Sequence, residues 1–132
     1  MKGLDTNVLV RFLVKDDAPQ ARRAAAYIRA ECHPDRPCLV NRIVLCELDW
    51  VLASAYGYPR AEIAGVVEKL LRADALLVED SETAWQGLRA YRTGAADLAA
   101  CLMGAVNRRL GCDSTATFDR AAARLAEFEL LA

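Results

Sequence analysis

A chain of 132 residues, 55% of them hydrophobic and 27% charged, is long enough to bury a core and too hydrophobic to be disordered, so one domain over 1–132 is predicted. No stretch free of Asp, Glu, Lys and Arg is longer than Leu98 to Asn107, far below the roughly 20 apolar residues that span a bilayer. With no apolar signal segment near the N-terminus, this excludes a membrane span and predicts a cytoplasmic location. The net charge of −1 argues against broad nonspecific attraction to nucleic acid.

The first residues predict a short strand that ends in an acid. Gly3-Leu4 runs into Asp5, and the polar residues Thr6 and Asn7 precede a new apolar segment. In open α/β sheets ligands bind outside the carboxyl ends of the strands, which makes Asp5 a candidate site residue. The alternative is that Asp5 only caps the helix that follows it.

The rest of the chain alternates between helical and extended patterns. Helices are predicted over about 6–15, 19–32, 41–56, 60–72, 81–94, 98–110 and 120–126, and further strands over 38–40, 75–78, 115–119 and 128–131. Strands separated by helices need crossover connections, which predicts a mostly parallel sheet covered by helices on both faces. The carboxyl ends of parallel strands lie along one rim, so Asp5 and Asp119, which each end a strand, are expected to meet there.

The helix over 41–56 contains a second candidate acid. Glu47 has apolar residues at helical spacing on both sides, among them Val44 and Trp50, so we expect its carboxylate to lie against an apolar face. A charge in that position is costly unless it is paired or binds a metal. A buried arginine partner is the alternative, and Asp49, on another side of the helix, is the weaker candidate.

Cysteine and histidine offer little chemistry. The five cysteines show no two-residue gap typical of zinc or redox motifs and are expected to be small buried hydrophobes: Cys32, Cys38, Cys46, Cys101 and Cys112. The single histidine, His33, has no second histidine with which to build a zinc site or a catalytic triad.

Clustered carboxylates repel one another, so at neutral pH they raise a pKa or bind a cation. Magnesium and manganese are the natural occupants of sites made only of oxygen. Because the chain has no Gly-rich phosphate loop of the Walker type, metal-assisted phosphoryl chemistry is the reaction class that remains. A phosphoacceptor domain that uses Asp5 is a third reading with no other specific support.

Three segments together resemble the PIN domain family, and in particular the VapC-type toxins of bacterial toxin–antitoxin pairs: Gly3 to Val10, Leu45-Cys46-Glu47-Leu48 and Thr117-Phe118-Asp119. The resemblance covers essentially the whole chain. It implies an α/β/α sandwich around a parallel sheet, usually dimeric, that acts as a magnesium- or manganese-dependent endoribonuclease and is inhibited by a cognate antitoxin. By the same resemblance Asp5, Glu47 and Asp119 are metal-site acids, with Thr6, Asn7 and Thr117 as polar support.

The chain departs from the family pattern at one position. Relatives of this type commonly carry a second aspartate where this chain has Ala100, in the segment Ala96-Asp97-Leu98-Ala99-Ala100. Asp97 remains, and both a helix cap and a metal-site acid are open roles for it. Two functions therefore stay open, a working ribonuclease that uses Asp97 as the fourth acid and a catalytically weakened module that binds an antitoxin or RNA.

Overall fold

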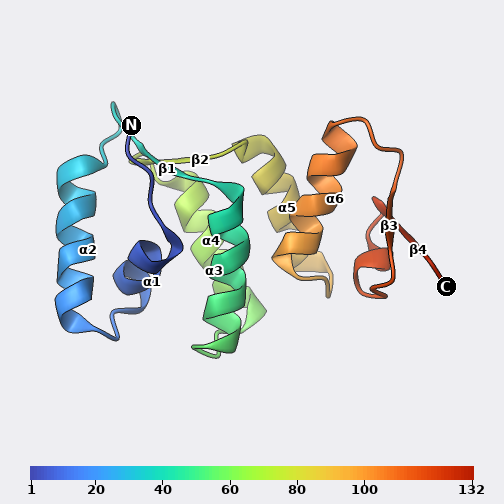
Figure 1. Ribbon diagram of the computed structural model, residues 1–132, viewed down its shortest axis with the longest axis horizontal. Helices are drawn as coiled ribbons and strands as arrows, with labels where there is room; N and C mark the ends of the chain where they lie inside the picture. Colours follow the sequence, from blue (N-terminus) through green and yellow to red (C-terminus); the bar gives the residue numbers. More distant parts are fainter.

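The computed structural model describes residues 1–132 and is elongated, with α2 at one end and β4 at the other (Figure 1). Its elements, in chain order, are α1 Thr6–Val14, α2 Ala18–Glu31, β1 Cys38–Val40, α3 Arg42–Ser54, α4 Arg60–Arg72, β2 Leu76–Val78, α5 Ser81–Thr93, α6 Leu98–Arg109, β3 Thr115–Thr117, the 3-10 turn η1 Ala122–Arg124, and β4 Phe128–Leu130. None of the helices combines the length and the apolar character needed to cross a bilayer.

Polar residues fix where four of the helices begin. In each case a side-chain oxygen accepts a backbone N–H of the first turn, which satisfies one of the unpaired donors at a helix start. These caps are Asp5 before α1, Asp17 before α2, Asn41 before α3 and Asp97 before α6. Because capping is local, the predicted positions of these helices are confirmed.

The strands β1 and β2 form the first of the two strand pairs. They pair in parallel, with Val40 opposite Val78, and the N-terminal segment adds to the other side of β1 through a parallel bridge between Gly3 and Leu39. Cys38 and Val40 are fully buried, and they belong to a core of 22 residues that extends from Leu4 to Leu102. The α/β class with parallel strands, predicted from the alternation of elements, is confirmed.

The strands β3 and β4 form a second parallel pair that does not join the first. Figure 1 shows this pair beyond α6, at the opposite end of the molecule from the N-terminal segment. Two finer expectations are corrected: the N-terminal strand is reduced to the single bridge at Gly3, and the helix expected over 120–126 is the short turn Ala122–Arg124. The strands thus form two separate parallel pairs instead of one continuous sheet.

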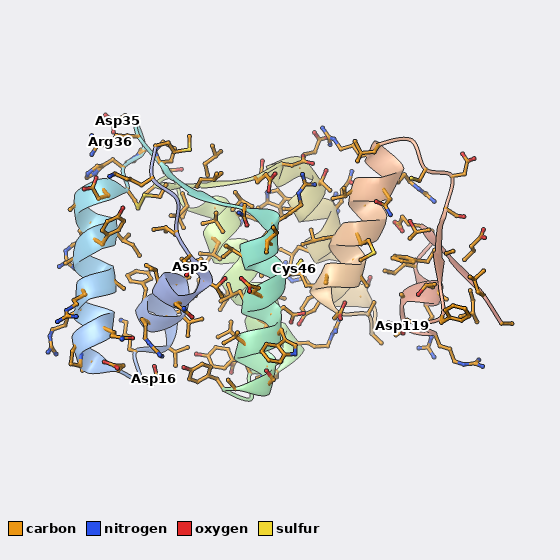
Figure 2. All side chains as sticks on the ribbon, viewed as in Figure 1. Asp5, Asp16, Asp35, Arg36, Cys46 and Asp119 are labelled. Carbon is orange, nitrogen blue, oxygen red and sulfur yellow. A yellow bond between two sulfur atoms is a disulfide. The ribbon has the colours of Figure 1, made fainter.

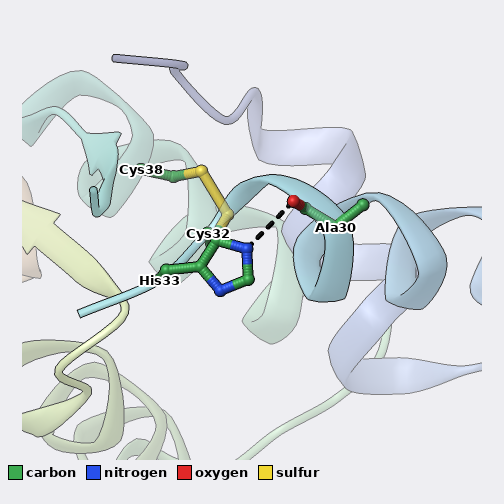
Figure 3. Close-up of a disulfide and its surroundings, with 4 residues drawn as sticks. All are labelled: Ala30, Cys32, His33 and Cys38. Atoms are coloured by element: carbon green, nitrogen blue, oxygen red, sulfur yellow. Dashed lines mark hydrogen bonds between the residues drawn. A yellow bond between two sulfur atoms is a disulfide. The ribbon is translucent and has the colours of Figure 1, made fainter. Parts of the chain in front are cut away.

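Two cysteine expectations are also corrected, because Cys112 is exposed and Cys32 and Cys38 form a disulfide (Figure 3). The loop between them is closed by reciprocal backbone hydrogen bonds between His33 and Arg36, which bring the end of α2 back to the start of β1. The His33 ring contacts the carbonyl of Ala30 at 3.0 Å. The pairing depends on this turn and not on a short sequence spacing, which is why no cysteine motif indicated it.

Candidate active site

Asp5 and Glu47 are connected through Thr6. Asp5 lies exposed before α1, and its Oδ1 accepts the Thr6 backbone N–H at 2.8 Å. The buried Thr6 hydroxyl donates to Oε1 of Glu47 on α3 at 2.7 Å. The start of α1 therefore holds two carboxylates from distant parts of the sequence. Figure 2 shows Asp5 beside α3.

The expected burial of Glu47 is wrong, because its side chain is exposed. Helix α3 turns a different face inward, which carries Val44, Leu45, Leu48, Asp49 and Leu52. The apolar residues at helical spacing from Glu47 are divided between the two sides: Ile43 and Trp50 are 66% and 71% exposed, whereas Val44 is buried. Apolar neighbours at helical spacing thus did not imply a buried face, and no buried arginine partners Glu47.

The acid that is buried in α3 is Asp49, at 8% exposure. Its Oδ1 accepts the hydroxyl of Tyr91 on α5 at 2.8 Å, and its Oδ2 accepts the backbone N–H of Leu98 at the start of α6 at 3.0 Å. Burial, and then the hydrogen bond to Asp49, raises the pKa of Tyr91 far above its usual range. The signal in the sequence was the helical spacing of Asp49 with Leu45 and Leu52, both fully buried.

Asp97 acts as the N-cap of α6, because its Oδ1 accepts the Ala100 N–H at 2.8 Å. It also lies near α3: burial raises the pKa of the Cys46 thiol, and the charges of Asp97, Asp49 and Glu47 raise it further. Asp97 and Glu47 thus flank Cys46 from two helices. Ala100 is in the first turn of α6, as the predicted start of that helix required.

Asp119 does not meet Asp5, which corrects the expectation of a shared rim. Asp119 is exposed in a turn after β3, where its Oδ1 accepts the Ala121 N–H at 2.9 Å and its N–H donates to Thr117 Oγ1 at 3.0 Å. Figure 2 shows Asp119 at the far side of α6 from Asp5. The physical reason is the divided sheet: the rim argument needs the N-terminal strand and β3 in one sheet, and they are not paired within the chain.

Asn7 and Asp5 open onto a groove of about 510 Å³ between α1 and α2, which we call the N-terminal groove. Its walls carry apolar, polar and basic side chains and one acid, Asp5: Gly3, Leu4, Asp5, Asn7, Val8, Arg11, Gln20, Arg23, Ala24 and Tyr27. The groove therefore runs directly beside the N-terminal segment.

Comparison with known families decides what this arrangement belongs to. The family model described as PIN domain matches residues 3–128, nearly the full chain. The chain belongs to the PIN domain family. Searches of curated proteins and of solved structures find no match.

PIN domains are generally metal-dependent nucleases and typically use divalent metals. Within a single chain of this PIN domain, no three side chains of His, Cys, Asp or Glu are close enough together to hold a metal ion. Asp5 and Glu47 approach each other, Asp97 lies beyond Cys46, and Asp119 is at the other end of the molecule. Hard divalent ions need several oxygen ligands, so the donor set of one chain in this arrangement does not fit one.

Proposed function

We propose that this PIN domain is an endoribonuclease of the VapC type, a toxin that depends on magnesium or manganese and is inhibited by a cognate antitoxin. The observation that carries the proposal is the hydrogen bond from Thr6 to Glu47, which fixes a second carboxylate beside Asp5 at the open end of α1. Both acids are exposed, so a phosphodiester backbone has access to them. The family match over 3–128 supports the nuclease class.

The proposed site uses four acids that lie in three places in the chain: Asp5 with Glu47, Asp97, and Asp119. Asp5 and Glu47 form the fixed group, and Thr6 holds the carboxylate of Glu47 in one orientation. Asp97 approaches from the start of α6, with one oxygen already committed to capping that helix. Asp119, with Thr117 bound to its backbone N–H, belongs to the site through its motif and needs a different sheet arrangement to reach it. Asn7 lies in the groove beside Asp5.

The direct test is incubation of the purified protein with RNA, with and without manganese. We expect cleavage only with the metal, and its loss in Glu47→Gln. Glu62→Gln is a matched control, because Glu62 is also an exposed helical glutamate but lies on α4, away from Asp5. Cleavage without metal, or equal loss of cleavage in both variants, would contradict the proposed site.

A second function, binding of an antitoxin or RNA by a catalytically weakened domain, is favoured by Ala100. Ala100 stands in the first turn of α6 and supplies no carboxylate. One oxygen of Asp97 already accepts the Ala100 N–H as the cap of this helix. An aspartate at position 100 would be stabilised by the helix dipole and lie near Asp97. If the weakened module is correct, Ala100→Asp raises both manganese affinity and RNA cleavage, measured by calorimetry and a cleavage assay. Unchanged values would favour Asp97 as the working fourth acid.

The antitoxin is tested separately from cleavage. Production of the chain alone is expected to stop bacterial growth, and production together with a cognate antitoxin is expected to restore growth and to yield a stable complex. Growth arrest by Glu47→Gln equal to that by the unchanged chain would argue against RNA cleavage as the cause of toxicity.

A further inference from the structure

A pocket of about 360 Å³ lies between α5 and α6, and we call it the α5–α6 pocket. Arg89 on α5 and Arg108 and Arg109 on α6 line it, together with Glu127 just before β4. Three arginines and one glutamate make this lining net positive, although the chain as a whole has a net charge of −1. None of the four acids of the proposed nuclease site lines the pocket, so it is a separate site.

Two of the three arginines have no carboxylate partner. Arg109 pairs with Glu82 at 3.3 Å, whereas Arg89 and Arg108 are exposed and form no ion pair. Arg108 is nevertheless held in place, because its Nη2 donates to the Ala126 carbonyl at 3.2 Å. The other N–H groups of the guanidinium stay free, and their fork geometry matches two oxygens of a phosphate.

Glu127 lines the same pocket and also forms no ion pair. Opposite charges thus line one cavity without closing onto each other, which leaves room for a ligand that carries both an anion and a hydrogen-bond donor. A carboxylate repels a phosphate but accepts a hydrogen bond from a hydroxyl group. In a nucleic acid that hydroxyl is the ribose 2′-OH, which distinguishes RNA from DNA. The charges of the pocket therefore fit a ribonucleotide.

The buried part of the lining is small and neutral. Cys101 and Ala105 are both buried, and their short side chains leave the pocket open. Burial raises the pKa of the Cys101 thiol to about 11, although the charge of Arg60 acts to lower it. The thiol is therefore protonated at neutral pH and adds no negative charge that would repel a phosphate.

Helix α6 connects the pocket to one of the acids of the proposed nuclease site. Asp97 caps the start of α6, and Arg108 follows eleven residues later, which is about 16 Å along the helix axis. Stacked nucleotides rise by about 3.4 Å each, so about five of them cover this distance. One RNA strand is long enough to occupy the pocket while a bond several nucleotides away lies at the acids.

We propose that the α5–α6 pocket anchors the backbone of an RNA strand, with a phosphate held by Arg89 and Arg108 and the 2′-hydroxyl of the same nucleotide held by Glu127. Contacts of this kind position a strand and do not read its bases. Cleavage of the anchored strand rests on the proposed nuclease function, whereas the binding does not.

The salt dependence of binding tests the phosphate contact. The probe is a short labelled single-stranded RNA of mixed sequence, and its affinity is measured by fluorescence anisotropy with a metal chelator present, so that no cleavage occurs. The double variant Arg89→Gln, Arg108→Gln should lower the slope of log affinity against log salt by about 0.7, the value for one phosphate on a single strand. The same loss corresponds to about fivefold weaker binding near 0.1 M salt.

The matched control is the double variant Arg22→Gln, Arg29→Gln, which removes the same charge. Both of these arginines are exposed on α2 and line neither the α5–α6 pocket nor the N-terminal groove. Thermal melts check that each variant keeps its fold. Equal slopes for the two double variants would overturn the proposal, because binding would then depend on overall charge and not on this pocket.

Comparison of RNA with DNA of the same sequence tests the role of Glu127. Glu127→Ala should narrow the preference for RNA about tenfold, as expected for the loss of a hydrogen bond to a charged group. Glu129→Ala removes the same charge from β4, where its carboxylate accepts the Ser114 hydroxyl at 2.7 Å, and should leave the preference unchanged. An unchanged preference in Glu127→Ala would overturn the assignment of the 2′-hydroxyl to Glu127.

Competition separates an RNA strand from a small phosphate ligand. Inorganic phosphate and a nucleoside 5′-monophosphate should displace the labelled RNA only at millimolar concentrations, because each supplies the contacts of one nucleotide at most. Displacement by the monophosphate at micromolar concentrations, lost in Arg89→Gln, would overturn the proposal and make a free nucleotide the ligand.

Cleavage assays keep this inference apart from the proposed nuclease function. With manganese present, the double variant Arg89→Gln, Arg108→Gln should raise KM about fivefold and leave kcat unchanged, because the pocket contributes binding that is equal in the ground state and the transition state. Cleavage together with equal salt slopes would reject the pocket and leave the nuclease standing. A lowered slope in a protein that never cleaves RNA would support the pocket and reject the nuclease.

Discussion

The two strand pairs are both parallel and both consist of three-residue strands, and yet they differ in how deeply they are buried. In β1 and β2, Cys38, Val40 and Val78 are between 0% and 4% exposed and belong to the main core, and Leu77 alone is exposed, at 43%. In β3 and β4, Phe128 alone is buried, and Leu130 is 40% exposed. Parallel sheets are normally buried on both faces, and an isolated pair is marginal in water. The second pair therefore has fewer buried contacts to stabilise it than the first.

The largest expected effect is at Asp49, which links α3 to α5 and α6. Asp49→Ala leaves the buried Tyr91 hydroxyl and the Leu98 N–H without their acceptor, which should lower the free energy of unfolding by about 2–4 kcal/mol. Urea unfolding followed by circular dichroism measures it. Asp97→Ala is the control, since loss of a solvent-exposed cap should cost only about 1 kcal/mol. Equal losses would show that Asp49 is not a special link between α3, α5 and α6.

A pair of truncations compares the strands directly. Val40→Ala removes two methyl groups from a fully buried site and should cost about 2 kcal/mol of unfolding free energy. Leu130→Ala, at a half-exposed site of β4, should cost less than about 1 kcal/mol in dilute protein. The two values come from the same urea titrations. A larger loss in the Leu130→Ala variant than in the Val40→Ala variant would show that β4 lies in a packed core.

Hydrogen exchange compares the stability of the two strand pairs without any substitution. Amides in β1 and β2 should exchange about tenfold or more slowly than those in β3 and β4 at low protein concentration, because opening an exposed pair costs less free energy. Equal exchange rates in the two pairs would show that β3 and β4 are as well protected as β1 and β2.

The smallest effect concerns Glu47. Because its side chain is exposed and its contact is a single hydrogen bond from Thr6, Glu47→Gln should change the unfolding free energy by less than about 1 kcal/mol in the absence of metal. Thermal melts beside Glu62→Gln measure this. A loss of several kcal/mol would indicate a buried ion pair that the structure does not contain.

Local features of the sequence decided most of the elements. The caps Asp5, Asn41 and Asp97 act on the first turn of their own helices, so the starts of α1, α3 and α6 could be read from residues a few positions apart. The same holds for the candidate acids, because Asp5 and Asp119 follow short extended segments whatever those segments pair with. The sequence alone therefore determined the order of helices and strands and the membership in an acid-bearing α/β class.

Only the tertiary structure decided which faces and edges meet. The exposure of Glu47 and the burial of Asp49 depend on which side of α3 packs against α5 and α6, and both sides of α3 carry apolar residues. The disulfide between Cys32 and Cys38 depends on a turn that no cysteine spacing encodes. The separation of Asp5 from Asp119 depends on contacts such as Phe128 on Gly104, which hold β3 beyond α6. Strand pairing over more than a hundred residues is a choice between packed surfaces, and a pattern along one chain does not contain that choice.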